Sequence, residues 1–276
     1  MQDKVIPFDF NNTQIASFYD EVSVWSAHFG QLMLQHLKPK HNLTILDLAC
    51  GTGYPLFQLA YLYGASCKVI GLDIWSTALK RAEQRRQYFG LEHLELVKYN
   101  GTTYPFPDNH FDLITSNVGV NNFDDPASAL AECHRVLKPN GHIAITTNTI
   151  GHMQAFYTVF HDILKAHGNN EYIERLIQHE NHRGTIASHR ALLENAGFSI
   201  ITETSDSFTW RFLDGTTLFN HPVIRMGFLP AWLSVINKEA AIQPIFNAIE
   251  KQLNQIASDN GELSLTIPIL YLEGMK

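Results

Sequence analysis

Two carboxylates and two glycines have the spacing of a small-ligand site. Asp47 stands just before the turn that contains Gly51 and Gly53, and Asp73 ends a second apolar run at 67–73. Glycines between a strand and a helix let the backbone approach a ligand, and the helix N-terminus offers free N–H groups. An acidic residue after the second strand can hold a ribose diol, although it can equally cap the following helix. Asp47 would repel a pyrophosphate and attract an ammonium group. The glycine spacing also departs from the dinucleotide fingerprint G-x-G-x-x-G, so a nicotinamide-dependent oxidoreductase is disfavoured.

Short apolar runs alternate with helical patterns around this turn and must position it. Strands are expected at 43–48, 67–73, 94–99, 111–116 and 142–147, with helices at 54–63, 76–89 and 126–137. Such alternation predicts βαβ units, a parallel sheet and right-handed crossovers. Asp125 followed by Pro126 predicts the start of the third helix. Further on, 151–180 and 210–258 look helical, a strand is expected at 198–203, and Pro268 suggests an edge position for a last strand at 262–272.

The composition limits the possible partners. The chain has 276 residues, a formal net charge of -7, 45% hydrophobic residues and three cysteines. The acidic balance argues against a nucleic-acid binder, which needs a basic face. Cysteines without a CxxC pair favour a reducing cytoplasm. Neither a signal-peptide core nor a membrane span is expected, and no metal-ligand pattern is convincing.

Four ordered motifs resemble class I S-adenosylmethionine-dependent methyltransferases, in particular the subgroup of quinone-biosynthesis and small-molecule enzymes. They are Ile45-Leu-Asp-Leu-Ala-Cys-Gly-Thr-Gly53, Gly71-Leu-Asp73, the run Asn100 to Asp112, and Arg135-Val-Leu-Lys-Pro-Asn-Gly141. The resemblance implies an α/β, Rossmann-like, doubly wound and mostly parallel sheet of seven strands. The last strand would be antiparallel, and helical lid segments would be inserted.

This reading divides the chain into six segments. They are an N-terminal helical arm at 1–42, a cofactor-binding core at 43–150, a helical lid at 151–187, a continuation of the core at 188–209, a second helical lid at 210–260, and a final core strand at 261–276.

The resemblance also assigns the cofactor contacts. Asp47 and the turn Ala49–Gly53 would hold the methionine end, and Asp73 the ribose hydroxyls. Asn100 stands where the family usually has Asp opposite the adenine amino group, and its amide oxygen can still accept. Ile74 would line the adenine, or pack under a helix instead. The complete expected set is Tyr19, Asp47, Ala49, Cys50, Gly51, Gly53, Asp73, Ile74, Asn100, Gly101 and Asn117.

Expected acceptor contacts come from the polar run after the fourth strand and from aromatic-rich lid segments. Asn121 and Asn122 replace a Leu-His-His or Leu-His-Trp run of the subgroup, and they could also form a simple loop. The expected acceptor set is Trp25, Asn121, Asn122, Trp210, Arg211, His221 and Arg225. His28, His152 and His221 are candidates for a general base, although the chain has 14 histidines and most must have other roles.

The predicted function is methyl transfer from S-adenosylmethionine to a small-molecule acceptor by in-line displacement, which leaves S-adenosylhomocysteine. Positioning and exclusion of water would supply most of the rate. The alternative is a protein that binds this cofactor without methylating, or uses the sulfonium for other chemistry. The sequence leaves open C-, N- or O-methylation and whether the protein is a homodimer.

Overall fold

The sheet consists of seven strands in the order β3-β2-β1-β4-β5-β7-β6. The computed structural model describes residues 1–21, 24–99 and 103–276. The strands are β1 (Thr44–Leu48), β2 (Lys68–Asp73), β3 (Leu94–Lys98), β4 (Phe111–Asn117), β5 (Leu137–Asn148), β6 (Ser199–Phe212) and β7 (Leu263–Met275). This order places β1 and β4 in the middle, where the chain reverses its direction of travel across the sheet.

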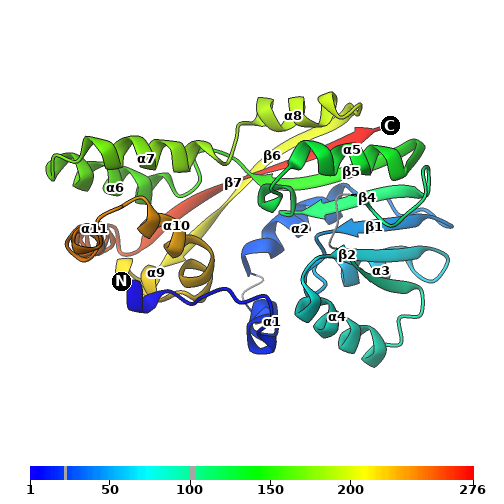
Figure 1. Cartoon of the computed structure of the whole chain (residues 1–276), viewed down its shortest axis with the longest axis horizontal. Helices are drawn as coiled ribbons and strands as arrows, with labels where there is room; N and C mark the ends of the chain where they lie inside the picture. The colour runs from blue at the N-terminus through cyan, green and yellow to red at the C-terminus, as the bar shows by residue number, and fades with distance from the viewer. Residues whose placement is uncertain (22–23, 100–102) are drawn as a thin grey trace. The chain divides into compact units, whose positions relative to one another are not determined.

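The central strands are parallel and, as is usual for parallel strands, they are largely buried on both faces. Ile45 of β1 pairs in parallel with Val69 of β2 and with Leu113 of β4, and Ile45 and Val69 are fully buried. The pairs β2–β3 and β4–β5 are parallel as well. β7 runs opposite to β1 and β4 (Figure 1). The expected Rossmann-like fold with an antiparallel last strand is therefore confirmed.

Two compact units share the sheet, and their parts alternate along the chain. The sheet unit consists of Asp9–Thr147, Thr185–Ser205 and Ile269–Lys276, and the helix-rich unit of Met1–Phe8, Asn148–Gly184 and Asp206–Pro268. The arm expected at 1–42 is divided between them, since residues 9–42 group with the sheet. The later boundaries, at 148, 185, 206 and 269, fall three to eight residues from the expected ones at 151, 188, 210 and 261.

The helices of the sheet unit lie before the first strand or between strands. They are α1 (Thr13–Glu21), α2 (Val24–His36), α3 (Leu56–Tyr63), α4 (Ser76–Tyr88), α5 (Pro126–Val136) and α8 (Ile186–Asn195), with the 3-10 turn η2 (Val120–Asn122). α5 begins as its sequence predicts: the Asp125 side chain accepts from the Ser128 N–H at 3.0 Å, and Pro126 is the first helical residue. The buried core of this unit includes Leu46, Ile70, Ile114 and Leu130.

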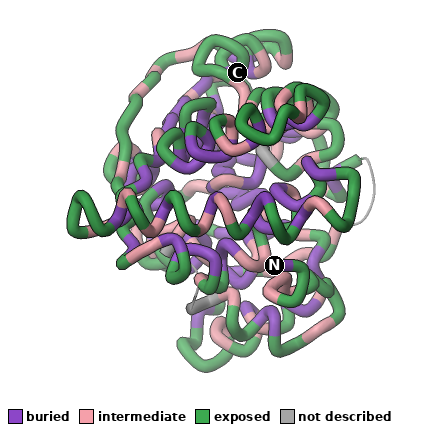
Figure 2. Tube along the Cα trace, turned by 90° about the vertical axis from the view of Figure 1, so that its left-hand side faces the viewer, coloured by how far each residue is buried: buried purple, intermediate pink, exposed green. Residues whose placement is uncertain are grey.

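The helix-rich unit has an aromatic core. Its helices are η1 (Gln2–Lys4), α6 (Gln154–Ala166), α7 (Asn170–Asn181), α9 (Gly215–Asn220), the π-helical turn η3 (Ile224–Phe228), α10 (Leu229–Ser234) and α11 (Glu239–Asn260). Phe156 stacks on Trp232 with ring centroids 4.0 Å apart, and both are fully buried. Along the trace of the helices, buried residues alternate with exposed ones (Figure 2). No helix within the described ranges has the length and hydropathy needed to cross a bilayer.

Three expectations about the strands were wrong. β7 lies between β5 and β6, so Pro268 is not on an edge strand; it is instead the last residue of the helix-rich unit, where the missing N–H coincides with a change of packing partners. β6 continues to Phe212, well beyond 203. β5 begins at Leu137, because Leu137 pairs with Phe111 and His142 with Leu113, leaving residues 138–141 as an irregularity within the strand.

Candidate functional site

Asp47 is a buried carboxylate with one oxygen available. Its side chain belongs to β1 and is 1% exposed. Oδ1 accepts a hydrogen bond from Thr115 Oγ1 of the neighbouring β4 at 2.7 Å, whereas Oδ2 has no partner among the described residues. Burial raises the pKa of Asp47 to about 7, the Thr115 hydrogen bond opposes the shift, and the charge of Asp73 adds to it. A buried carboxylate oxygen without a donor is costly, and it indicates a site for a cationic or N–H donor group of a ligand.

The glycine turn closes on Asp73. Gly51 N–H donates to Asp73 Oδ2 and Trp75 N–H donates to Oδ1, both at 2.7 Å. Each carboxylate oxygen retains a second lone pair for a ligand hydroxyl. Gly51 has φ +54°, and a Cβ there would meet nothing within 4 Å, so the turn presents open backbone at this point. Burial raises the pKa of Asp73, while its backbone hydrogen bonds, from Trp75, Gly51 and Ile74, lower it.

The N-terminal segment is fastened beside this turn within the sheet unit. The Phe10 carbonyl accepts from Trp75 Nε1 at 2.9 Å and from Thr77 Oγ1 at 2.6 Å. Tyr19 of α1 contacts the Trp75 ring edge-on, with centroids 5.3 Å apart. Burial, and secondarily the charge of Asp73, raises the pKa of Tyr19. Tyr19 therefore lies close enough to Asp73, the residue expected to bind the ribose, for the charge of Asp73 to affect it.

The first turns of α2 are held against the carboxyl end of β4 and against Tyr54, which lies just before α3. Asn117 Nδ2 donates to the Ser26 carbonyl at 3.1 Å, and its Oδ1 accepts from Thr146 Oγ1 at 2.7 Å. Tyr54 Oη donates to the Ala27 carbonyl at 3.0 Å. A Cβ on Gly30 would come within 2.8 Å of the Tyr54 ring, so this glycine permits the close approach.

Other expected residues of the sheet unit have varied settings. Ile74 is 57% exposed, which does not fit packing under a helix. Asn122 is exposed and donates to the Val118 carbonyl, as a loop residue does. Trp25 is half-buried against Phe29, and His28 is exposed on α2. Asn100, Gly101 and the Asn121 side chain lie outside the described residues.

Cys50 and Gly53 support the turn from the inside. The Cys50 thiol is buried, and burial raises its pKa well above the ordinary value. Gly53 has φ +110°, and a Cβ there would lie 2.2 Å from the Phe57 ring. Ala49 adopts φ +60°, and its N–H donates to the Leu72 carbonyl at 2.8 Å. These contacts fix the backbone path rather than offering polar side chains to a ligand.

The lid residues expected at the acceptor belong to the helix-rich unit. Trp210 is 7% exposed and contacts His221 edge-on at 4.9 Å. His221 Nδ1 accepts from the Val223 N–H at 3.2 Å, so its Nε2 carries the proton of the neutral ring and is no ready base. Exposed Arg211 is bonded to Glu262, and Arg225 Nε donates to the Lys4 carbonyl at 2.5 Å. Both arginines thus bind groups of their own unit.

His152 belongs to a buried polar cluster around Tyr157. Tyr157 Oη accepts from Trp232 Nε1 at 3.1 Å and lies 3.4 Å from His152 Nε2 and 3.2 Å from His179 Nε2. Burial lowers the pKa of His152 to about 3 and that of His179 to about 4, with Arg183 contributing to both shifts. Both imidazoles are therefore neutral at physiological pH. This cluster joins helices α6, α7 and α10.

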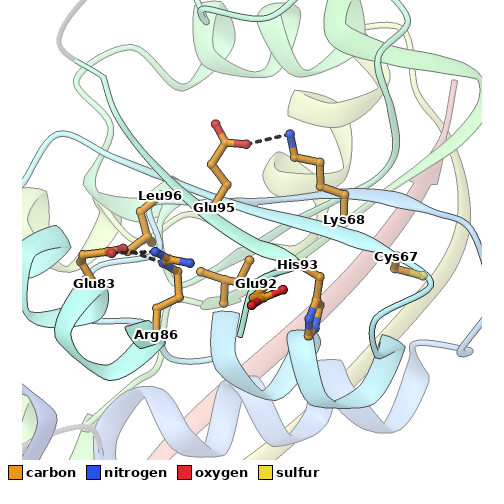
Figure 3. A pocket seen from close by; sticks show the side chains of 9 residues that line it. Cys67, Lys68, Glu83, Arg86, Glu92, His93, Glu95 and Leu96 are labelled. Atoms are coloured by element: carbon orange, nitrogen blue, oxygen red, sulfur yellow. Dashed lines mark hydrogen bonds and ion pairs between the residues drawn. The ribbon is translucent and has the colours of Figure 1, made fainter. Parts of the chain in front are cut away.

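A separate opening lies at the other edge of the sheet. Its volume is about 540 Å³, and it lies at the amino ends of β2 and β3 (Figure 3). Two ion pairs are part of its lining, Glu83 with Arg86 and Lys68 with Glu95, each at 2.7 Å. The glycine turn and Asp73 stand at the carboxyl ends of β1 and β2, so this opening is not part of the Asp47 site. Its lining is Cys67, Lys68, Glu83, Arg86, Glu92, His93, Leu94, Glu95 and Leu96.

The sequence did not reveal the groups that position the side chains expected to bind the ligand. Thr115 positions Asp47, Thr146 positions Asn117, and the carbonyls of Phe10, Ser26 and Ala27 anchor the N-terminal segments. A polar Thr or Asn within an otherwise apolar strand end was the available signal for the side chains. Nothing in the sequence marked the carbonyls, because every residue has one.

Comparison with known proteins establishes the family. The sequence matches the family described as a methyltransferase domain over residues 39–197, and the chain belongs to that family. The solved structure of a SAM-dependent methyltransferase from Aquifex aeolicus has a TM-score of 0.55 at 20% identity, covering 70% of this chain and 92% of that one. The fold is that of class I S-adenosylmethionine-dependent methyltransferases.

Several similar curated proteins carry the name demethylmenaquinone methyltransferase. The protein from Oceanobacillus iheyensis is 38% identical over 125 residues, which cover 44% of this chain and 52% of the relative. The protein from Listeria monocytogenes is 30% identical over 214 residues, covering 74% of this chain and 88% of the relative. The chain thus spans about half the length of the first relative. The expected resemblance to quinone methyltransferases is confirmed.

Proposed function

We propose that this protein transfers a methyl group from S-adenosylmethionine to a small-molecule acceptor of the quinone class. The observation that carries the proposal is Asp47 Oδ2, a buried carboxylate oxygen with no donor among the described residues. An α-ammonium group would supply that donor and the compensating charge. A nicotinamide dinucleotide would instead bring phosphates toward a carboxylate.

The surrounding residues fit the rest of the cofactor. Asp73 retains lone pairs for ribose hydroxyls beyond its bonds to Gly51 and Trp75. The open backbone at Gly51 admits a ligand at a distance that a side chain would deny. Ala49, Cys50 and Gly53 shape this turn, and Tyr19, Ile74 and Asn117 complete its surroundings in the proposal. When bound, S-adenosylmethionine supplies an activated methyl group.

The N-terminal segments act as a cover that keeps water from the cofactor. Asn117 and Tyr54 hold the Ser26 and Ala27 carbonyls, and Trp75 and Thr77 hold the Phe10 carbonyl. These contacts tie α2 and the segment before α1 to loops at the carboxyl ends of β1, β2 and β4. A site covered in this way favours a sulfonium reaction, because positioning and water exclusion supply most of the rate.

The acceptor class is inferred from the names of the relatives from Oceanobacillus and Listeria. We assign no general base. His152 is neutral and 2% exposed within the Tyr157 cluster, and His221 Nδ1 already accepts a hydrogen bond. A reduced quinone ring activates its own carbon through its hydroxyl groups. A base that takes up the hydroxyl proton through one bridging water would therefore suffice. Trp25 and Asn122 are the acceptor contacts that we retain, since both belong to the sheet unit.

Two measurements test the proposal. Isothermal titration with S-adenosylhomocysteine should give one site per chain, and S-adenosylmethionine with a labelled methyl group should label a reduced demethylated naphthoquinone. Absence of heat with S-adenosylhomocysteine would refute cofactor binding. Binding without label transfer to any reduced quinone would instead support the non-methylating alternative. An Asp47→Asn variant should lose most of this binding, and Asp112→Asn is its matched control, because Asp112 is bonded to Thr44 and Lys138 near the amino end of β4.

A further inference from the structure

Three aromatic rings form an exposed cluster on the sheet unit. Tyr61 of α3 is 51% exposed, and Tyr88 and Phe89 at the end of α4 are 85% and 52% exposed. The Phe89 ring contacts the Tyr88 ring at 5.2 Å and the Tyr61 ring at 6.5 Å, both edge-on. Single exposed apolar residues need no explanation, whereas a contiguous group of rings marks an interaction surface.

The aromatic cluster of Tyr61, Tyr88 and Phe89 lies away from the cofactor. The chain passes from β1 to β2 to β3 in one direction across the sheet, so both right-handed crossovers place α3 and α4 on the same face. The two helices lie side by side in Figure 1. Because these helices run back from the carboxyl ends of the strands, their last turns stand at the amino edge, opposite Asp47 Oδ2 and Asp73.

The helix that presents the cluster is basic, although the chain is acidic. α4 carries Lys80, Arg81, Arg85 and Arg86 against the one carboxylate Glu83, so its net charge is +3 in a chain of formal charge -7. Glu83 is neutralised by Arg86 at 2.7 Å and also accepts from Gln87. α3 has no charged residue.

Carboxylates around this edge are largely paired. Glu95, on the neighbouring β3, is bound to Lys68 at 2.7 Å, and Glu92 stands exposed in the loop before β3. Of the cations, Arg85 is directed inward to the Thr52 carbonyl and the Phe57 ring. Lys80 is exposed, and one and two helical turns later Gln84, Gln87 and Tyr88 are exposed as well. The outward side of α4 therefore combines the exposed cation Lys80 with amides and aromatic rings, while Glu92 lies in the loop that follows the helix.

We propose that the aromatic cluster and the outward side of α4 bind the surface of an anionic lipid bilayer. Tyrosine rings suit the headgroup level, because one end is apolar and the hydroxyl stays wet, and Phe89 supplies apolar area. Lys80, exposed on the same helix, attracts anionic headgroups, and the net charge of α4 adds to that attraction. This contact is peripheral and leaves the carboxyl edge of the sheet, with its glycine turn, accessible. It stands independently of the acceptor named above.

Sedimentation with lipid vesicles tests this surface. Wild-type protein should pellet with vesicles containing about 30% phosphatidylglycerol and should remain in the supernatant with pure phosphatidylcholine. Tyr88→Ser/Phe89→Ser should weaken the apparent partition coefficient about tenfold. Lys80→Glu should weaken it severalfold, and about 0.5 M salt should release the wild type. Leu213→Ser, which removes a 73% exposed apolar side chain of the helix-rich unit, is the matched control and should partition as the wild type does.

Each of the other outcomes would overturn the proposal. Wild-type protein that ignores anionic vesicles has no such surface, and a double variant that pellets normally places the contact elsewhere. If size-exclusion chromatography shows a wild-type dimer that the double variant dissolves, the cluster binds a second copy instead. Unchanged thermal unfolding and unchanged S-adenosylhomocysteine binding in the double variant ensure that lost sedimentation reports the surface and not misfolding or failure of the cofactor site.

Discussion

Replacing Asp47 with asparagine should stabilise the ligand-free protein at pH 8 and weaken cofactor binding at the same time. The side chain is 1% exposed, and its pKa is about 7 instead of the ordinary 3.8. The folded protein thus holds a proton on Asp47 in the interval between these two values, where the unfolded chain has lost it. Stability from this group consequently falls as pH rises from about 4 to about 7, and the loss is complete above pH 7.

The size of this effect follows from the shift. About three pH units at about 1.4 kcal/mol each give a cost on the order of 4 kcal/mol for the ionised carboxylate. Asparagine carries no charge and retains an oxygen for the Thr115 hydroxyl, but its buried amide lacks an acceptor, which costs about 1–3 kcal/mol. The net gain at pH 8 should be about 1–3 kcal/mol, and it should vanish at pH 5, where Asp47 is already protonated.

Binding changes in the opposite direction. Removing one partner of a buried charge pair costs about 2–5 kcal/mol, and the lower half of that range corresponds to about a 30- to 370-fold weaker Kd for S-adenosylhomocysteine. Thermal unfolding at pH 8 and pH 5, together with titration calorimetry, measures both quantities on the same samples. Asp47→Asn protein that binds within threefold of wild type, or that is less stable at pH 8, would refute the reasoning. The Asp112→Asn control should retain wild-type affinity.

Four further outcomes are expected. S-adenosylhomocysteine affinity of the wild type should fall about tenfold per pH unit below pH 7, because Asp47 becomes protonated there; a flat profile in calorimetry from pH 5 to 7 would contradict this. Tyr54→Phe should speed hydrogen exchange in the first turns of α2, because the Ala27 carbonyl loses its donor, while Tyr63→Phe serves as the control with its longer 3.5 Å contact. Gly53→Ala should cost about 2–4 kcal/mol in urea unfolding, because φ is +110° and the Phe57 ring blocks a Cβ, and Gly51→Ala should cost about half as much. As pH drops from 6.5 to 5, His152 and His179 become protonated in the unfolded state but not in the folded state. The free energy of unfolding should therefore decrease by about 1.4 kcal/mol for each histidine and each pH unit of this drop. A His152→Gln variant that keeps the full slope would show that the cluster is not the cause.

Local patterns in the sequence determined the core of the fold. Apolar runs of strand length, glycines at helix ends and the Asp125-Pro126 start each act within a few residues, and β1 to β4 and α5 lie where these signals predict. The order of the motifs likewise placed Asp47, Gly51, Gly53 and Asp73 at the ends of adjacent parallel strands, since strands joined by right-handed crossovers bring their carboxyl ends to one edge.

Tertiary structure alone decided which polar atoms remain available. Asp47 has one free oxygen because Thr115, 68 residues away, occupies the other. His152 is a candidate base and Arg211 and Arg225 are candidate acceptor contacts in the sequence, and the fold adds Tyr157, Glu262 and the Lys4 carbonyl as their partners. Pro268 suggested an edge strand and lies in an interior one. For Asp47, Arg211 and Arg225 the deciding partner is distant in sequence. A residue type and its spacing specify what a side chain can bind but not which partner the fold brings to it.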